Sequence, residues 1–199
     1  MKFVLSFLEF FFARKIFYKI NINLLKLIIR FIGYNNHGNL KDSGEIYFLK
    51  KVCLENPKLC IDVGANIGNY SKYLLKNSSS KIIAFEPMPK SFKELQNIRK
   101  KYVNRFFIFK VGIGEKKTNK IIYYSAKNLQ WANFNNEVNK IDYLKNNNKQ
   151  LKCKIDTLDN FFKKNRKLFK KQIDLIKIDT EGFEFEVLKG AKSTIKNFK

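Results

Sequence analysis

The sequence predicts an α/β protein with a parallel sheet, preceded by a helical N-terminal arm. Short apolar runs alternate with helical segments from residue 59 onward, which is the pattern of βαβ units. A glycine-containing turn at residues 62–68 joins the first strand to its helix. The 199 residues, 45% of them hydrophobic and 15% aromatic, suffice for one core and a short appendage.

Two domains follow from this pattern: an arm and linker at residues 1–43, and an α/β domain at residues 44–199. The domain opens with a helix that Pro57 ends. The core strands expected are 59–63, 81–86, 105–111 and 173–178. The helices expected are 44–55, a helix through Lys76, 91–101, 159–171 and 183–196. Two further β-rich runs are 120–124 and 151–155.

The arm, residues 1–32, interleaves apolar and basic side chains with a helical period. Glu9 and Arg14 interrupt its apolar stretch, and no small-residue cleavage site follows, so it is not a secretory signal. Lys15 and Lys19 fall in the middle of any membrane-spanning window. Two interpretations stay open: the arm packs on its own domain or a partner subunit, or it lies on an anionic membrane surface.

Composition excludes several kinds of site. The three cysteines form no CxxC pair, which excludes a disulfide framework and a zinc site built on paired cysteines. The single histidine, His37, lies in the polar linker and is assigned no role. Lys plus Arg outnumber Asp plus Glu by 40 to 17, a net charge of +23. Most of this excess is lysine, which favours a solvated surface over a dedicated nucleic-acid face.

The turn after the first strand carries Asp62, Gly64, Asn66 and Gly68. A dinucleotide site would need one more glycine, and Asp62 would repel its pyrophosphate. S-adenosylmethionine (SAM) has no phosphate and carries an ammonium and a sulfonium, which suit a carboxylate. We therefore predict a SAM site in which a side chain added at Gly64 would occupy ligand space.

Glu86 follows the second strand, 24 residues after Asp62. An acidic side chain at this strand end can accept hydrogen bonds from both ribose hydroxyls of a nucleoside. The alternative is a loop or helix-capping carboxylate.

Several blocks in order resemble the FkbM family of SAM-dependent methyltransferases, over roughly residues 44–197. They are 62–71, 84–89, 157–159, 173–182 and 187–191. The resemblance implies a class I Rossmann-like methyltransferase fold and methyl transfer to a hydroxyl oxygen, often in polysaccharide, glycolipid or polyketide pathways. It places the turn residues at the methionine end of SAM, Glu86 at the ribose, and the turn from Gly112 to Gly114 near the adenine.

The fourth core strand ends in carboxylates at the sheet edge where α/β proteins bind ligands. Asp179 is the first candidate for the group that takes the proton of an alcohol acceptor, and Glu181 the second. Lys177 would orient an acidic acceptor. Alternatively, Glu181 caps the next helix, or the two carboxylates hold Mg²⁺; no metal site is assigned. Trp131 and nearby aromatics are expected either in an acceptor lid or in a β-rich core.

A complete class I sheet has seven strands, so we expect this sheet to be truncated after the fourth, which is left as an unpaired edge. The function expected is O-methylation of a sugar, glycolipid or related small molecule in the cytoplasm, with the arm in peripheral contact with the inner membrane face. The alternatives are a truncated, non-catalytic domain that binds an anionic membrane or a partner, and, more weakly, a nucleic-acid methyltransferase.

Overall fold

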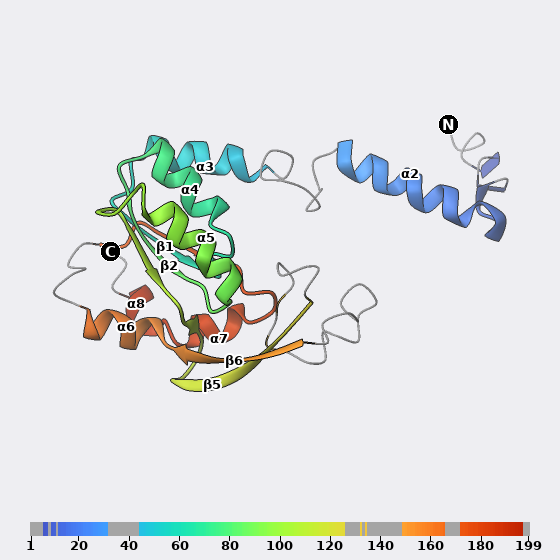
Figure 1. Cartoon of the computed structure of the whole chain (residues 1–199). Coiled ribbons are helices and arrows are strands. Elements are labelled where there is room, and N and C mark those ends of the chain that lie inside the picture. The colour runs from blue at the N-terminus through green and yellow to red at the C-terminus, as the bar shows by residue number, and fades with distance from the viewer. Residues whose placement is uncertain are drawn as a thin grey trace. The chain divides into compact units, whose positions relative to one another are not determined.

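The structure is a computed structural model that describes residues 6–7, 9–10, 12–31, 44–125, 132, 134, 149–165 and 172–196. The chain divides into two compact units, the arm unit (residues 1–51) and the sheet unit (residues 52–199), which are described separately below (Figure 1). The expected boundary at residues 43 and 44 stays a prediction.

The arm unit is helical, as its apolar periodicity predicts, but it is not one continuous helix. A single 3₁₀ turn, η1 (Lys15–Phe17), leads directly into α2 (Tyr18–Phe31). Arg14 immediately before η1 has extended backbone angles, which breaks the helical path. The helix α3 (Glu45–Leu54) matches the expected helix 44–55. Among the described residues, no helix is long and apolar enough to cross a membrane.

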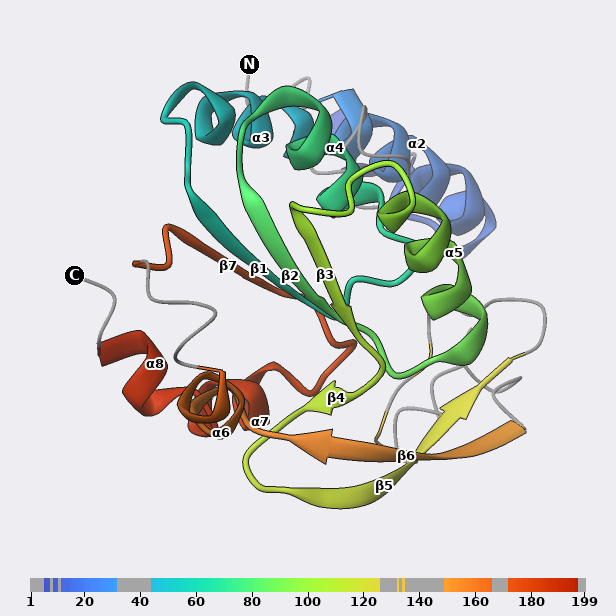
Figure 2. The same ribbon diagram turned by 60° about the vertical axis from the view of Figure 1, so that its left-hand side comes forward.

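The sheet unit is built on a four-stranded, all-parallel sheet in the order β3-β2-β1-β7 (Figure 2). Its strands are β1 (Leu59–Val63), β2 (Lys81–Phe85), β3 (Phe106–Phe109) and β7 (Leu175–Ile178). The predicted α/β class is confirmed. Within the described part of the chain β7 is paired only with β1, so it forms the expected edge of the sheet.

Helices cover both faces of this sheet, as Figure 2 shows. The bounds are α4 (Asn69–Asn77), α5 (Pro89–Arg99), α6 (Leu158–Lys164), α7 (Glu184–Lys189) and α8 (Lys192–Lys196). Alternate residues of β1 and β2 face α6 and α7 in one apolar cluster, which includes Ile61, Phe85, Leu158, Phe161 and Val187. The intervening side chains face α4 and α5, which lie on the other side.

A second sheet of three strands, ordered β4-β6-β5, follows the parallel sheet. Its strands are β4 (Gly112–Ile113), β5 (Thr118–Tyr124) and β6 (Lys149–Asp156). The two β-rich runs are thus confirmed as an antiparallel pair. The expected turn at Gly112 is instead a short strand, because its backbone pairs in parallel with β6.

The helix expected over 183–196 is two helices that meet at Gly190 and Ala191. The cause is Asp159 in α6, whose carboxylate accepts hydrogen bonds from the backbone N–H groups of Ser193 and Thr194 and so caps α8.

The fourth core strand also begins two residues later than expected. Asp174 lies just before this strand, and its carboxylate accepts hydrogen bonds from the backbone N–H groups of Lys58 and Leu59 at the start of β1.

Candidate active site

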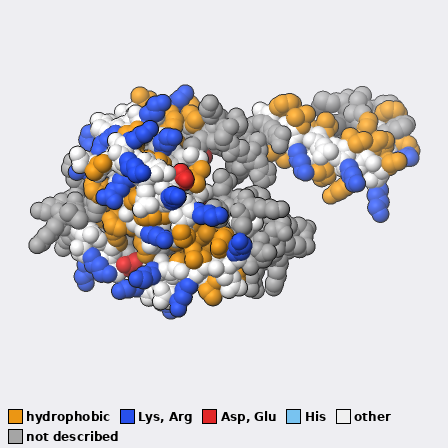
Figure 3. Space-filling view, viewed as in Figure 1, with side chains coloured by type: hydrophobic (Ala, Val, Ile, Leu, Met, Phe, Trp, Pro, Cys, Tyr) orange, Lys and Arg blue, Asp and Glu red, His pale blue; other side chains and the backbone are white. Residues whose placement is uncertain are grey.

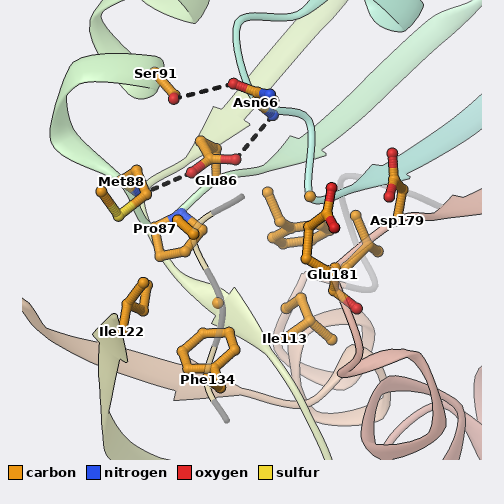
Figure 4. Close-up of a pocket in the computed structure, with 16 residues that line it drawn as sticks. Asn66, Glu86, Pro87, Met88, Ser91, Ile113, Ile122, Phe134, Asp179 and Glu181 are labelled. Atoms are coloured by element: carbon orange, nitrogen blue, oxygen red, sulfur yellow. Dashed lines mark hydrogen bonds between the residues drawn. The ribbon is translucent and has the colours of Figure 1, made fainter. Parts of the chain in front are cut away.

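A pocket that is partly open to solvent, with about 620 Å³ of empty space including solvent at its mouth, lies at the carboxyl ends of β1, β2 and β7 and beside β4 (Figure 4). The residues that line it are Val63, Gly64, Asn66, Phe85, Glu86, Pro87, Met88, Ser91, Gly112, Ile113, Ile122, Ala132, Phe134, Asp179, Thr180 and Glu181. Open α/β sheets bind ligands at this edge.

Glu86 is the most buried acidic group of the pocket, with 5% of its surface exposed. Its Oε2 accepts a hydrogen bond from the Asn66 N–H and its Oε1 one from the Met88 N–H, both 2.8 Å long. Burial raises the pKa of Glu86 to about 7, although these two hydrogen bonds and Lys177 favour the charged form. Each oxygen accepts one of these bonds and has capacity for another, so the carboxylate can take two hydroxyl donors.

Asn66 holds the turn against α5. Its backbone lies in the left-handed region at φ 50°, which asparagine tolerates better than most residues. This conformation aims its N–H at Glu86, and its side-chain Oδ1 accepts a hydrogen bond of 3.2 Å from the Ser91 hydroxyl. Figure 4 shows Ser91, Asn66, Glu86 and Met88 joined by these bonds along one side of the pocket.

Gly64 and Gly68 are required by packing as much as by ligand access. Gly64 has φ +75°, and a Cβ there would lie 1.9 Å from the backbone oxygen of Asp179. A side chain at Gly64 would therefore collide with the chain after β7, and the expectation that it would also occupy ligand space stays a prediction. Gly68 has φ +83°, and a Cβ there would lie within 2.7 Å of the side chains of Leu95 and Ile98, both on α5.

Asp62 lies behind the turn, 1% exposed and outside the pocket lining. Its Oδ2 accepts a hydrogen bond of 2.6 Å from the Ser71 hydroxyl, and its Oδ1 is 3.2 Å from the Lys177 ammonium. Lys177 also donates to the Gly64 carbonyl oxygen at 3.0 Å and lies 3.4 Å from Asp179 Oδ2. Lys177 thus makes one hydrogen bond, to Gly64, and two ion pairs, to Asp62 and Asp179, so it connects β1, the glycine turn and the chain after β7 instead of presenting a free cation to an acceptor.

Burial alone would lower the pKa of Lys177, but the carboxylates of Asp62 and Asp179 more than offset it and raise the pKa above its usual value. Lys177 is therefore charged at neutral pH. The buried charge of Asp62 is paired within the protein, and its role toward the cofactor stays a prediction.

Asp179 and Glu181 lie on the opposite side of the pocket from Glu86, on the loop after β7 (Figure 4). The Asp179 side chain is 62% exposed. Glu181 has φ 53°, an unfavourable backbone conformation for glutamate that points to a constrained loop. Burial, then the charges of Asp179 and Glu184, raise the pKa of Glu181.

Glu184, the first residue of α7, holds the loop that precedes the helix. Its carboxylate accepts hydrogen bonds from the N–H groups of Thr180 and Gly182, and the N-cap Phe183 has no side-chain capping bond. Within the described residues the Glu181 carboxylate has no hydrogen-bond or ion-pair partner. The helix-capping alternative for Glu181 is thus wrong.

The remaining wall of the pocket is apolar. Ile122 of β5 and Met88 belong to one cluster, against which Phe134 packs. The Phe134 ring lies 4.7 Å from the ring of Phe183, and Ile113 of β4 lines the pocket nearby. A flat aromatic ligand would fit this wall better than a charged one. Trp131, expected near the acceptor, lies outside the described residues.

Most of the predicted site residues meet at this pocket: Gly64, Asn66, Glu86, Gly112, Asp179 and Glu181 line it, whereas Asp62 and Gly68 lie behind it. Sequence reasoning missed Met88 and Ser91. Their signal is the run Glu86-Pro-Met-Pro89, because two prolines hold Met88 extended and fix the start of α5, which places both side by side with Glu86.

Comparison with known proteins gives one family match and several partial structural likenesses. A family model of the methyltransferase FkbM domain matches residues 62–199. No curated protein matches the chain.

Three solved structures resemble parts of the chain. A candidate RNA methyltransferase from Pyrococcus horikoshii is 19% identical, with 34% of each chain covered and a TM-score of 0.30. A candidate transferase from Pyrococcus horikoshii is 28% identical, with 35% of this chain and 27% of that chain covered and a TM-score of 0.31. The O-MT segment of StiE is 17% identical, with 39% of this chain and 31% of that chain covered and a TM-score of 0.31. The chain thus spans about a third of the length of these structures.

Proposed function

Because this chain belongs to the FkbM family of methyltransferases, we propose that it binds SAM in the pocket at the sheet edge and methylates a hydroxyl group of a sugar, glycolipid or related small molecule. The observation that carries the proposal is Glu86, a buried carboxylate that lines the pocket at a strand end and whose two oxygens each accept one backbone hydrogen bond.

The pocket residues fit this cofactor. Glu86 would accept the two ribose hydroxyls, since each of its oxygens has capacity for one more hydrogen bond. Ile113, Ile122 and Phe134 form an apolar wall suited to the adenine. The methionine end would then lie toward Gly64 and Asp179, where the negative charges outnumber the one ammonium of Lys177.

SAM supplies a methyl group bound to a positively charged sulfur, which a nucleophilic oxygen can displace. The chain's own part is to position that oxygen and to accept its proton. Glu181 is suited to accept the proton because its carboxylate is unpaired among the described residues and its pKa is raised toward neutrality. Asp179, the first candidate from sequence, lies 3.4 Å from the Lys177 ammonium, a contact that suits it to anchoring the loop.

Calorimetric titration of the full chain with SAM tests the binding site. Glu86→Ala should weaken binding by about 1.5–3 kcal/mol, the range for hydrogen bonds to a charged group. Glu94→Ala is the matched control, because Glu94 is exposed on α5 and outside the pocket lining. If Glu86→Ala loses no more SAM affinity than the control, and both variants melt at the wild-type temperature, Glu86 is a loop carboxylate and does not bind the cofactor.

Transfer itself is tested by incubating the chain with SAM and a panel of free and lipid-linked sugars, and by following a gain of one methyl mass. Glu181→Gln should lower turnover more than Asp179→Asn while SAM affinity is kept. If Asp179→Asn has the larger effect, the roles are reversed. SAM binding without transfer to any hydroxyl acceptor would favour the non-catalytic alternative.

A nucleic-acid substrate has less support. On the face shown in Figure 3, the lysine and arginine side chains are spread among apolar and other side chains instead of forming one basic patch. Such a spread is expected of a solvated lysine-rich surface, whereas nucleic-acid binding concentrates basic side chains on one face.

A further inference from the structure

The helix α2 of the arm unit has a cationic side. Lys19 and Lys26 are seven residues apart, so they project from the same side of the helix, and both are exposed. The 14 residues of α2 contain no Asp or Glu. This helix therefore carries uncompensated positive charge.

A second side of α2 is apolar and exposed. We call it the apolar row: Ile20, Leu24, Ile28 and Phe31, at helical spacing, with exposed fractions of 59%, 55%, 48% and 77%. Figure 3 shows hydrophobic side chains along this helix with basic side chains at its margin. Four large apolar side chains in one row exceed the scattered exposure normal for a protein surface.

The side of α2 opposite the apolar row carries Ile22 and Ile29, which are half-buried. Asn21 lies at the margin of the row, seven residues before Ile28, and donates a hydrogen bond of 2.8 Å from its side-chain amide to the Phe12 carbonyl oxygen. The row itself is 48–77% exposed, so the described residues of the arm unit do not cover it.

We propose that α2 lies along the surface of an anionic lipid bilayer, with the apolar row inserted at the boundary between headgroups and acyl chains. The lysines on the other side can extend their long stems to the lipid phosphates. An interfacial position also agrees with the length of α2, since no described helix can cross a bilayer.

Charge favours an anionic bilayer over a second copy of the chain as the partner of the apolar row. Each copy carries a net charge of +23, so two copies repel each other, whereas an anionic bilayer attracts the chain from a distance. The attraction must weaken with salt, because screening shortens its range.

Co-sedimentation of the full chain with vesicles tests the proposal, using phosphatidylcholine with and without 30% phosphatidylserine. The wild type should bind the anionic vesicles and be released by about 0.5 M salt. Lys19→Gln with Lys26→Gln should weaken binding about 25-fold, from about fivefold for each lysine. Leu24→Asn with Ile28→Asn should weaken it at least about tenfold.

The control is Lys93→Gln with Lys100→Gln, which removes two exposed lysines at the same separation from the sheet unit. If the control variant loses as much vesicle affinity as Lys19→Gln with Lys26→Gln, net charge and not α2 drives binding. That result would overturn the proposal. So would equal binding to neutral vesicles. A wild type that ignores vesicles but forms dimers, which Leu24→Asn with Ile28→Asn dissociates, would assign the apolar row to a second copy. Circular dichroism of each variant confirms that it is folded.

Discussion

Glu86 should make the cofactor-free protein less stable as the pH rises, which is opposite to the usual behaviour of a paired carboxylate. In the folded chain its pKa is about 7, against a usual value of 4.5, because burial opposes its charge. A group with a raised folded pKa contributes stability that is fully present below its unfolded pKa. That contribution is lost as the pH rises through the folded pKa.

The difference of about 2.5 pKa units corresponds to about 3 kcal/mol of unfolding free energy, lost between about pH 4.5 and pH 7. Other carboxylates act in the opposite sense. Hydrogen bonds outweigh burial and lower the pKa values of Asp156, Asp159 and Glu184, so their contributions are lost at the acid end. The effect of Glu86 is therefore best isolated by comparison with a variant.

Urea unfolding of the wild type and of Glu86→Gln at pH values from 5 to 8 makes this comparison. Glutamine does not titrate, and at pH 5 the variant should be less stable than the wild type because its amide cannot accept both backbone hydrogen bonds. This stability difference should narrow or reverse as the pH rises, and Glu94→Gln should show no such trend. A difference that stays constant from pH 5 to pH 8 would refute the assignment of a raised pKa to Glu86.

Three further changes have expected outcomes, each measured by denaturant unfolding. Gly64→Ala should lower the free energy of unfolding by about 3 kcal/mol or more, because the new Cβ collides with the chain after β7. Gly182 also has a positive φ but has open space around it, so Gly182→Ala should lower it by only about 1 kcal/mol. Equal losses in the two variants would mean that the contact with the chain after β7 is unimportant. Lys177→Met should lower the free energy of unfolding by about 3 kcal/mol, because it leaves the Asp62 carboxylate buried without its ion pair. Adding Asp62→Asn to this variant should recover part of the loss. If the stability losses of the two substitutions simply add, the two residues are not paired. Asp159→Ala should cost about 2 kcal/mol by uncapping α8, and a change within a few tenths would contradict that cap.

The core strands and the pocket edge were predictable from sequence because they depend on local patterns. An apolar run such as that of β1, followed by a glycine turn, predicts both a buried strand and a ligand at its carboxyl end. Glu86 was predictable for the same reason, since its strand and spacing are local features.

What the sequence could not predict depends on contacts between distant segments. Lys177 was expected to face an acceptor, but the carboxylate and carbonyl that bind it belong to a turn 113 residues earlier. The split at Gly190 likewise follows from Asp159, about 35 residues before the N–H groups that it caps. Periodicity within a window carries no information on such partners.

The pairing of β1 with β7 has a consequence for synthesis on the ribosome. Leu59 and Asp174 are joined across 115 residues, so β1 has one open edge until β7 has been translated. At about 5–20 residues per second, that interval is roughly 6–23 s. During it, the Gly64 turn lacks both the Lys177 ammonium and the backbone it packs against. We therefore expect nascent chains that end before β7 to be bound by chaperones and cut by proteases at β1, and chains that include it to be protected.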